Sequence, residues 1–213
     1  DSRFYNIMHM SYLGGLFNLG LIPLACGGST LVSPAFSGST ILRFWQEVMR
    51  YEVTILWLVP TMIRSLIQVI GPRWESVAKD SQKVRVSFLG TAPIDLEEKL
   101  AFERIFGVPL LENYGLSETT FLSAETMDSR FKRRQRGVGE ALPWVEMRLV
   151  AAGDESDPVG PLRIEVRTPF LFEGYFGGEG NFQPIDPEAW FDTGDLGHLD
   201  GSQLILDGRI RDV

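Results

Sequence analysis

The sequence predicts an α/β fold in which a βαβ parallel-sheet subdomain is followed by an antiparallel, β-rich subdomain. Between residues 29 and 113, short apolar segments alternate with segments that have the apolar spacing of helices, which is the pattern of βαβ units. After Gly115 the segments alternate in polarity and are separated by Gly, Pro and Asp turns, as is typical of antiparallel strands. The 213 residues are 44% hydrophobic and 23% charged, a globular composition that excludes disorder, collagen and coiled coil.

Apolar spacing predicts the elements of the first subdomain. Residues 53–59 (VTILWLV) form an uninterrupted apolar run, which indicates a strand buried on both faces. Ser39 is expected to cap a helix, Asp95 and Glu98 to form a capping box, and Gly107 to end the helix that this box begins. In chain order we expect helix 11–22, strand 29–32, helix 40–51, strand 53–59, helix 60–70, strand 84–89, a capped helix ending at 106 and strand 109–113.

The β-rich subdomain is expected to follow residue 130. The change in character falls between residues 125 and 137, so we expect subdomains of residues 1–130 and 131–213. Residues 130–136 (RFKRRQR) are basic in an acidic chain and are interpreted as a solvated surface loop, with a phosphate contact as the alternative. The expected antiparallel strands are residues 145–150, 162–168 and 203–206.

Charge and cysteine content limit the class of partner and the compartment. Twenty-eight acidic against 20 basic residues give a net charge of -8, which argues against nucleic acid as a partner. The single cysteine, Cys26, cannot close an intrachain disulfide and is expected to be a buried, inert thiol in a cytoplasmic protein. The apolar run 12–28 lacks a basic flank and contains Asn18 and Pro23. We therefore prefer a buried helix there to a signal peptide or a membrane span.

Two loops that follow predicted parallel strands are the first candidates for a ligand site, since open α/β sheets bind ligands beyond the carboxyl ends of their strands. Residues 90–93 (GTAP) are small and let the main chain approach a flat ligand. In residues 113–120 (NYGLSETT), Tyr114 can stack on a purine, Ser117 can bond a phosphate oxygen and Glu118 can hold magnesium. The alternatives are a packed aromatic residue and a Ser-Glu helix cap.

Two further candidates lie near the end of the chain. In residues 190–195 (WFDTGD), Asp195 follows a Thr-Gly turn and can accept hydrogen bonds from adjacent ribose hydroxyls; the alternative is an Asx turn that joins two strands. In residues 208–212 (GRIRD), Arg209 can reach ribose or phosphate oxygens, or it is an ordinary surface arginine.

Taken together, these segments resemble, in order, motifs of the adenylate-forming superfamily: acyl- and aryl-CoA synthetases, nonribosomal peptide adenylation domains and beetle luciferases. Residues 190–195 are similar to its Trp-Phe-x-Thr-Gly-Asp motif without departure, and residues 208–212 to its Gly-Arg-x-x-Asp hinge motif. Three other segments resemble family motifs with one departure each: residues 113–118 have Ser117 for Thr, residues 90–93 have Thr91 for Gly, and residues 160–164 with Gly174-Tyr175 have Pro161 for Glu.

The resemblance implies a role for each matching residue. Tyr114 would stack on adenine, and Asp195 and Arg209 would bind ribose. Ser117 would contact the α-phosphate, and Glu118 would hold Mg²⁺. The adenine site would be lined by Gly90, Thr91, Ala92, Asn113 and Gly115. Arg211 would occupy the hinge position, and His9 would lie beside the carboxylate pocket, although a lone His on an apolar segment is usually structural.

By the same resemblance, the chain is expected to be an internal fragment of a larger adenylate-forming N-terminal domain, with its β-rich part a distorted barrel. The family's phosphate loop and the C-terminal domain with the catalytic lysine would belong to other parts of the parent protein. We therefore expect the fragment alone to be inactive.

The implied reaction is the ATP-dependent activation of a small-molecule carboxylic acid to an acyl-adenylate, followed by thioester formation with coenzyme A. Residues 11–21 contain no acidic side chain to pair with a substrate ammonium group, which favours a fatty or aryl acid over an amino acid. The alternatives are an adenylation module that serves carrier-protein phosphopantetheine, a non-catalytic adenylate-binding module, and a partner-binding domain that docks through residues 130–136.

Overall fold

The computed structural model describes residues 2–77, 83–128, 137–152 and 161–210. These residues form two compact units, Asp1–Leu111 and Glu112–Val213, which are described separately below. The predicted fold class is confirmed, because the first unit contains a parallel sheet and the second contains antiparallel strands. The predicted subdomain boundary at residue 130 and the basic loop 130–136 lie outside the described residues and stay predictions.

A four-stranded parallel arrangement organises the first unit. Its strands occur in the order β2-β1-β3-β4, and every described pairing between them is parallel. The most buried strand is β3, where Leu56 and Leu58 are fully buried, as the apolar run predicted. The bounds are β1 Arg3–Asn6, β2 Ser29–Val32, β3 Ile55–Leu58 and β4 Val86–Leu89.

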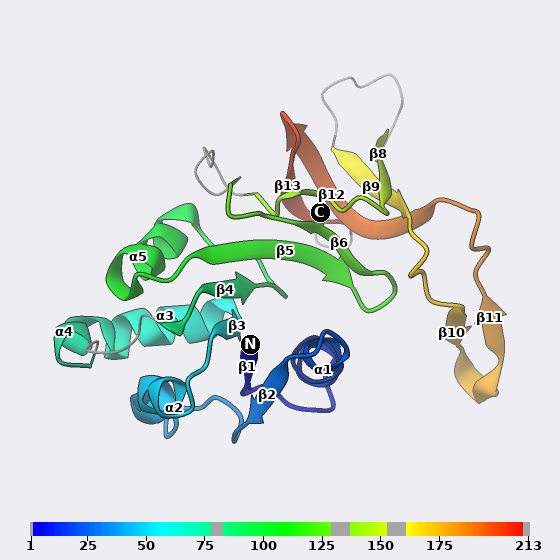
Figure 1. The fold of residues 1–213 in the computed structure, drawn as a ribbon. Coiled ribbons are helices and arrows are strands. Elements are labelled where there is room, and N and C mark those ends of the chain that lie inside the picture. The colour runs from blue at the N-terminus through cyan, green and yellow to red at the C-terminus, as the bar shows by residue number, and fades with distance from the viewer. Residues whose placement is uncertain (1, 78–82, 129–136, 153–160, 211–213) are drawn as a thin grey trace. The chain divides into compact units, whose positions relative to one another are not determined.

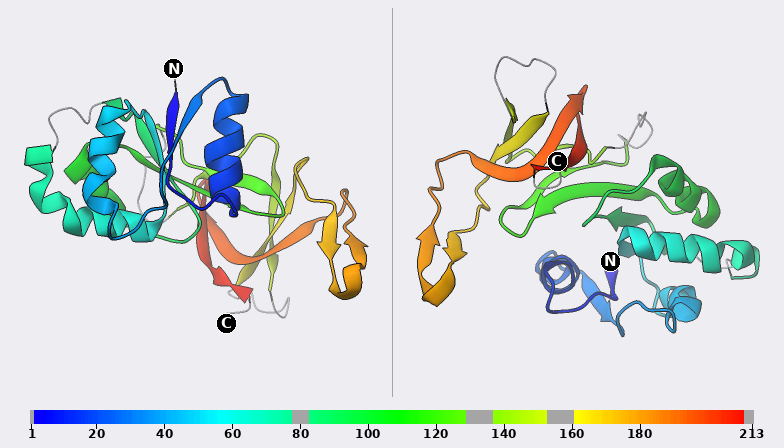
Figure 2. Two further views of the ribbon diagram at one scale, coloured as in Figure 1. Left: turned by 90° about the horizontal axis from the view of Figure 1, so that it is seen from below. Right: turned by 180° about the vertical axis from the view of Figure 1, so that it is seen from behind.

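Helices flank this sheet on both sides. Figures 1 and 2 show α1 and α2 on opposite sides of the β1–β2 pair, as expected of βαβ units. The first predicted helix is a π-helix, η1, that continues into α1, and the second begins with one 3₁₀ turn, η2. The helical segments are η1 Gly14–Leu21, α1 Ile22–Ala25, η2 Ile41–Arg43, α2 Phe44–Arg50, α3 Pro60–Val69, η3 Gly71–Arg73, α4 Trp74–Val77 and α5 Leu96–Phe106.

One predicted helix cap is wrong, and the predicted capping box is only half formed. Ser39 makes no cap, because its hydroxyl bonds that of Ser37 over 2.9 Å and the helical segment begins only after Thr40. The Asp95–Glu98 capping box is half formed: Asp95 makes no side-chain cap bond, but the Glu98 carboxylate accepts a hydrogen bond from the Asp95 backbone amide. The same carboxylate accepts two hydrogen bonds from Arg64 over 2.7 and 2.9 Å. The predicted stop is confirmed, since Gly107 adopts φ 68° at the end of α5.

Aromatic packing fills the space between the helices of the first unit. The Trp45 ring lies 5.2 Å from Phe44, 4.8 Å from Trp74 and 5.1 Å from Phe106, measured between ring centroids. Trp45 is 1% exposed, so this cluster is a major part of the core. Cys26 follows α1 and is exposed, so the expectation of a buried thiol is wrong. Within the described ranges, no helix has both the length and the apolar character to cross a bilayer.

The second unit consists mainly of antiparallel strands. Strand β5, Leu110–Leu116, begins in the first unit and continues into a hairpin with β6, Thr120–Ala124, which pairs in turn with β7, Glu140–Ala141. A separate four-stranded sheet has the order β13-β12-β9-β8. Its bounds are β8 Glu146–Ala151, β9 Leu162–Arg167, β12 Phe191–Asp200 and β13 Gln203–Arg209.

A hydrophobic core joins the hairpin to the four-stranded sheet. Tyr114 and Leu122 from the hairpin pack with Ile164, Val166 and Leu204 from the sheet. A further ribbon, β10 Gly174–Phe176 with β11 Phe182–Pro184, extends beyond the sheet in Figure 1. The sequence did not predict this ribbon or β6, and it predicted the segment of β12 only as a turn.

Candidate functional site

Two side chains from distant parts of the second unit meet at Asp195 on β12. The Tyr114 hydroxyl on β5 donates a hydrogen bond of 2.7 Å to Asp195 Oδ2, and Arg209 Nε on β13 lies 3.0 Å from Asp195 Oδ1. Tyr114 and Asp195 are 7% and 6% exposed, whereas the side chain of Arg209 is 64% exposed. The carboxylate is therefore anchored from the core on one side and paired with a solvent-exposed cation on the other.

The backbone of β12 is shaped around this carboxylate. Asp192 Oδ1 accepts a hydrogen bond of 2.9 Å from the Gly194 amide, an Asx-type bond, and Gly194 has φ 73°. The Thr193 hydroxyl donates to the Ile164 carbonyl over 2.8 Å and accepts from the Asp195 amide over 3.2 Å. The pairing of β12 with β9 shifts register between Asp192 and Leu196. The Asx bond thus lies inside a long strand, at an irregularity of its pairing. Such irregularities redirect side chains, here that of Asp195.

The environment of Tyr114 keeps its hydroxyl protonated. Burial raises the pKa of Tyr114 most, and the negative charge of Asp195 raises it further, because a phenolate there would be both desolvated and repelled. Tyr114 therefore remains a hydrogen-bond donor to Asp195 throughout the physiological pH range. The alternative of a packed aromatic is correct for the ring of Tyr114 in this conformation, since it belongs to the hydrophobic core.

The β5–β6 hairpin presents Ser117 and Glu118 at its turn. Gly115 lets the two strands approach closely, since a Cβ atom there would lie 1.9 Å from the Thr120 carbonyl oxygen. Thr120 itself adopts φ 56°, which is uncommon for a residue other than glycine. Ser117 is exposed at the turn, so the alternative of a Ser-Glu helix cap is wrong. Asn113 lies on β5 opposite Ala124.

Glu118 is held by the segment that leads into β10. Its backbone carbonyl accepts a hydrogen bond of 2.8 Å from the Phe172 amide, and its Oε1 accepts one of 3.1 Å from the Tyr175 hydroxyl. We did not predict a role for Tyr175 from the sequence; the Gly174-Tyr175 motif was the only available signal. In the described ranges, no group of three or more His, Cys, Asp or Glu side chains is placed to hold a metal ion.

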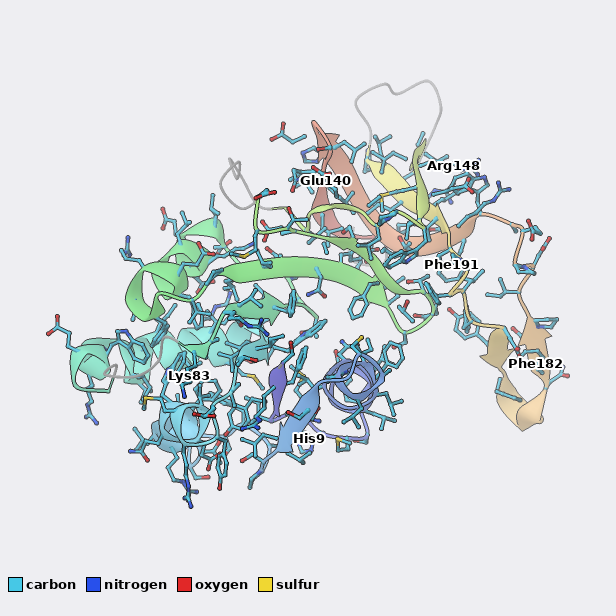
Figure 3. The ribbon with its side chains drawn as sticks, viewed as in Figure 1. His9, Lys83, Glu140, Arg148, Phe182 and Phe191 are labelled. Carbon is cyan, nitrogen blue, oxygen red and sulfur yellow. The ribbon has the colours of Figure 1, made fainter. Side chains whose placement is uncertain are left out.

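The remaining candidates belong to the first unit. Residues 90–93 follow β4, with Gly90 buried, Thr91 at φ 81° and Ala92 exposed. His9, which is labelled in Figure 3, follows β1 and is exposed. Its carbonyl accepts a hydrogen bond of 3.1 Å from the Tyr12 amide. Because β1 and β4 belong to one parallel sheet, both segments leave it at the carboxyl edge. Arg211 lies outside the described residues.

The first unit thus has a parallel sheet with candidate loops at its carboxyl edge, and the second has a strand irregularity that presents a buried carboxylate. A model of the family described as AMP-binding enzyme matches residues 1–176, and the chain belongs to this family.

Curated relatives are CoA ligases by name. The chain is 28% identical to indoleacetate--CoA ligase of Aromatoleum aromaticum, with 100% of this chain and 41% of the relative covered. It is 30% identical to malonate--CoA ligase of Arabidopsis thaliana, with 99% and 36% covered. It is 29% identical to 2-succinylbenzoate--CoA ligase of Bacillus subtilis, with 95% and 39% covered. The chain thus spans 36% to 41% of the length of these relatives.

Solved structures share the fold. ATP-bound MatB from Rhodopseudomonas palustris has a TM-score of 0.78 at 27% identity, with 100% of this chain and 41% of that chain covered. O-succinylbenzoate coenzyme A synthetase from Bacillus subtilis, in complex with ATP and magnesium ion, has a TM-score of 0.77 at 24% identity, with 100% and 42% covered. The likeness to the second protein concerns the fold alone.

Proposed function

We propose that this chain supplies adenosine- and metal-binding residues to an AMP-forming acid–thiol ligase, which activates a carboxylic acid with ATP and transfers it to coenzyme A. The observation that carries this proposal is Asp195, held between Tyr114 and Arg209 at the irregularity of β12. Family membership supports the adenylation step, and the names of the relatives support coenzyme A as the acceptor thiol.

Asp195 and Arg209 are the proposed ribose ligands. A carboxylate has about four lone-pair sites, of which Tyr114 and Arg209 occupy two, so capacity remains for two ribose hydroxyls. The guanidinium of Arg209 is exposed and also has free donor capacity for oxygen atoms of the ligand. The hydroxyl of Tyr114 is proposed to fix the orientation of Asp195. Stacking of the Tyr114 ring on adenine stays a prediction, because the ring packs in the hydrophobic core.

Ser117 and Glu118 are proposed to face the phosphates. An exposed hydroxyl at a hairpin turn can donate to the α-phosphate. Glu118 suits Mg²⁺, which is usually held by one or two carboxylates together with substrate phosphates. When bound, Mg²⁺ would neutralise charge on the phosphate oxygens. Gly90, Thr91, Ala92, Asn113 and Gly115 are proposed to line the adenine, and Arg211 is proposed as the hinge residue.

The proposed chemistry depends on positioning rather than on a nucleophilic side chain. The substrate carboxylate attacks the α-phosphorus of ATP, which forms the acyl-adenylate and releases pyrophosphate; the thiol then attacks the acyl carbon and releases AMP. This chain contributes orientation of the adenosine and neutralisation of developing charge. We propose that it cannot complete the reaction alone, and that it acts in the cytoplasm.

The proposed acid is an uncharged acyl or aryl acid. The segment after His9, including η1, has no acidic side chain that could pair with the ammonium group of an amino acid. The relatives named for indoleacetate and 2-succinylbenzoate fit a site without such a carboxylate. His9 is the candidate contact for the substrate carboxylate, because its exposed imidazole follows a strand at the carboxyl edge of the sheet.

Calorimetric titration with AMP and with a nonhydrolysable acyl-adenylate analogue tests the proposal. We expect the wild-type chain to bind both, and Asp195→Ala to weaken both by at least about tenfold, since roughly 1.4 kcal/mol corresponds to a factor of ten. Asp207→Ala is the matched control, because Asp207 is an exposed carboxylate on the neighbouring strand that pairs with His198. Equal affinities for the wild type and Asp195→Ala would contradict the ribose role.

A further inference from the structure

The segment 172–175 holds Glu118 at two points, and the two contacts differ in kind. The first is a backbone hydrogen bond, from the Phe172 amide to the Glu118 carbonyl over 2.8 Å, which fixes the position of the hairpin turn. The second is a side-chain hydrogen bond, from the Tyr175 hydroxyl to Glu118 Oε1 over 3.1 Å, which fixes the direction of the carboxylate. In the part of the chain that the structure describes, Tyr175 is the hydrogen-bond donor to this carboxylate.

The position of Tyr175 is set by a ring contact and by the backbone of β10, not by burial. Its side chain is 46% exposed, but its ring packs edge-on against Phe172 with centroids 4.6 Å apart. Gly174 precedes it at φ 154°, where a Cβ atom would lie 2.1 Å from the Gln183 carbonyl oxygen. The close antiparallel pairing of β10 with β11 therefore requires glycine at position 174, and it fixes the backbone from which the Tyr175 side chain extends. The ring contact with Phe172 and the backbone at Gly174 therefore direct the exposed Tyr175 hydroxyl toward Glu118.

One of these two aromatic residues, Phe172, also contacts the strand that carries Asp195. Phe172 packs edge-on against Phe191, with centroids 5.9 Å apart, and Phe191 is the first residue of β12. Figure 3 shows Phe191 at the start of this strand and Phe182 on the separate ribbon. One short segment thus contacts both the turn with Glu118 and the strand with Asp195.

We propose that Tyr175 is a positioning residue for the metal-binding carboxylate Glu118, an inference that rests on the proposed function. By donating to Oε1, the hydroxyl leaves Oε2 and the other lone pairs of the carboxylate available to a divalent cation. It also restricts the rotamers of Glu118 before the cation arrives, which lowers the ordering cost of binding. Donors that orient metal ligands typically change metal affinity by about 10- to 100-fold when they are removed.

The test compares ATP affinity with and without Mg²⁺. AMP is the comparison ligand, because it lacks the β- and γ-phosphates of ATP. The dissociation constants of ATP and AMP are measured by calorimetry in Mg²⁺ and in chelator, for wild type, Glu118→Gln, Tyr175→Phe and Tyr51→Phe. Tyr175→Phe removes only the hydroxyl and keeps the ring contact with Phe172. Tyr51→Phe makes the same change at an exposed tyrosine of the first unit.

We expect Mg²⁺ to strengthen ATP binding by the wild type and by Tyr51→Phe, and Glu118→Gln to abolish this gain. Tyr175→Phe should reduce the gain by about tenfold, the lower end of the range for groups that orient a metal ligand. Its AMP affinity and its urea midpoint should equal those of the wild type, which a merely structural role for Tyr175 would not predict.

Other outcomes separate the two proposals. If Glu118→Gln abolishes the Mg²⁺ gain but Tyr175→Phe keeps it in full, the positioning role of Tyr175 is overturned and the proposed function stands. If Tyr175→Phe weakens AMP and ATP binding equally, the tyrosine supports the fold rather than the cation, and the inference is again overturned. If the wild type shows no Mg²⁺ gain, or Glu118→Gln retains it, the metal role of Glu118 fails and the inference fails with it.

Discussion

Tyr114 on β5 donates a hydrogen bond of 2.7 Å to Asp195 Oδ2 on β12, a contact between residues 81 positions apart in the chain. Both side chains are buried, and the bond joins the β5–β6 hairpin to the four-stranded sheet within the second unit. A hydrogen bond of this kind links stability to ligand binding, because the same carboxylate that anchors the core is the proposed ribose ligand.

Replacing Tyr114 by phenylalanine should therefore affect stability. The substitution keeps the ring in the core and removes the hydroxyl that donates to Asp195. Asp195 then keeps its ion pair with Arg209. We expect a loss of about 1 to 2 kcal/mol in the free energy of unfolding, the scale of a buried hydrogen bond to a charged group. Urea denaturation measures it, with Tyr12→Phe at an exposed tyrosine as the control. Equal stability of the two variants would mean that water replaces the hydroxyl without cost.

The stability of the protein should fall at alkaline pH. The pKa values of Tyr5 and Tyr114 are both raised, mainly by burial, above the value near 10 that they have in the unfolded chain. Below pH 10 both tyrosines contribute fully to the stability of the folded state. Above pH 10 the unfolded state loses tyrosine protons that the folded state keeps, and this stability is lost. Each tyrosine should then lower the free energy of unfolding by about 1.4 kcal/mol per pH unit.

Urea midpoints between pH 8 and pH 11.5 test this alkaline loss. The slope above pH 10 should be about half as steep in Tyr5→Phe and in Tyr114→Phe as in the wild type, since each variant lacks one of the two groups. A slope that is unchanged in Tyr114→Phe would show that the folded state does not protect this hydroxyl from ionisation.

Gly115 should not tolerate even a methyl group. A Cβ atom at this position would meet the Thr120 carbonyl oxygen at 1.9 Å, and backbone must move to relieve the contact. We expect Gly115→Ala to lower the free energy of unfolding by about 3 kcal/mol, the upper part of the range for overpacking. Gly178→Ala is the matched control, because nothing lies within 4 Å of a Cβ atom there, and it should change stability by less than about 0.5 kcal/mol. Similar losses in both variants would contradict the close approach.

Trp190 contacts two arginines of the four-stranded sheet. The guanidinium carbons of Arg148 and Arg167 are 4.4 and 4.7 Å from the centroid of its ring. In the described structure, Arg167 Nε is buried and has no hydrogen-bond partner, and the guanidinium of Arg167 lies over the indole ring. We expect a double-mutant cycle of Trp190→Leu and Arg167→Leu to give a coupling of about 0.5 to 1 kcal/mol by urea denaturation. A coupling of zero would mean that the stacking does not stabilise the fold.

Local patterns predicted most of the first unit. The apolar run at 53–59 indicated a central strand, Pro60 marked the start of α3 and Gly107 marked the end of α5, and all three are confirmed. These features depend on properties of a few adjacent residues, namely burial of both faces, a fixed φ angle and access to positive φ. The cap at Ser39 was wrong, because Ser37 competes for its hydroxyl. The capping box formed only in part, since Glu98 bonds the Asp95 backbone but Asp95 makes no side-chain cap bond.

The residues of the candidate site were predictable from the sequence, but their contacts were not. The motifs around Tyr114, Glu118 and Asp195 were visible in the sequence, because spacing along the chain identifies residue types that suit a nucleotide. Their contacts were not visible: Tyr114 with Asp195 and Tyr175 with Glu118 are separated by 81 and 57 positions. The exposure of Cys26 was also misjudged, since an apolar neighbourhood in the sequence does not decide which face of a helix end meets solvent.

The sequence by itself therefore determined the fold class, the order of the main elements and the family, because periodicity and motif order are local or one-dimensional properties. Only the tertiary structure decided which side chains orient the proposed binding residues Asp195 and Glu118. The hydrogen bonds of Tyr114 and Tyr175 depend on how a hairpin, a sheet and a short ribbon pack together in the second unit. Such contacts arise from packing between distant strands, where burial and strand register, rather than neighbouring residues, select the partner.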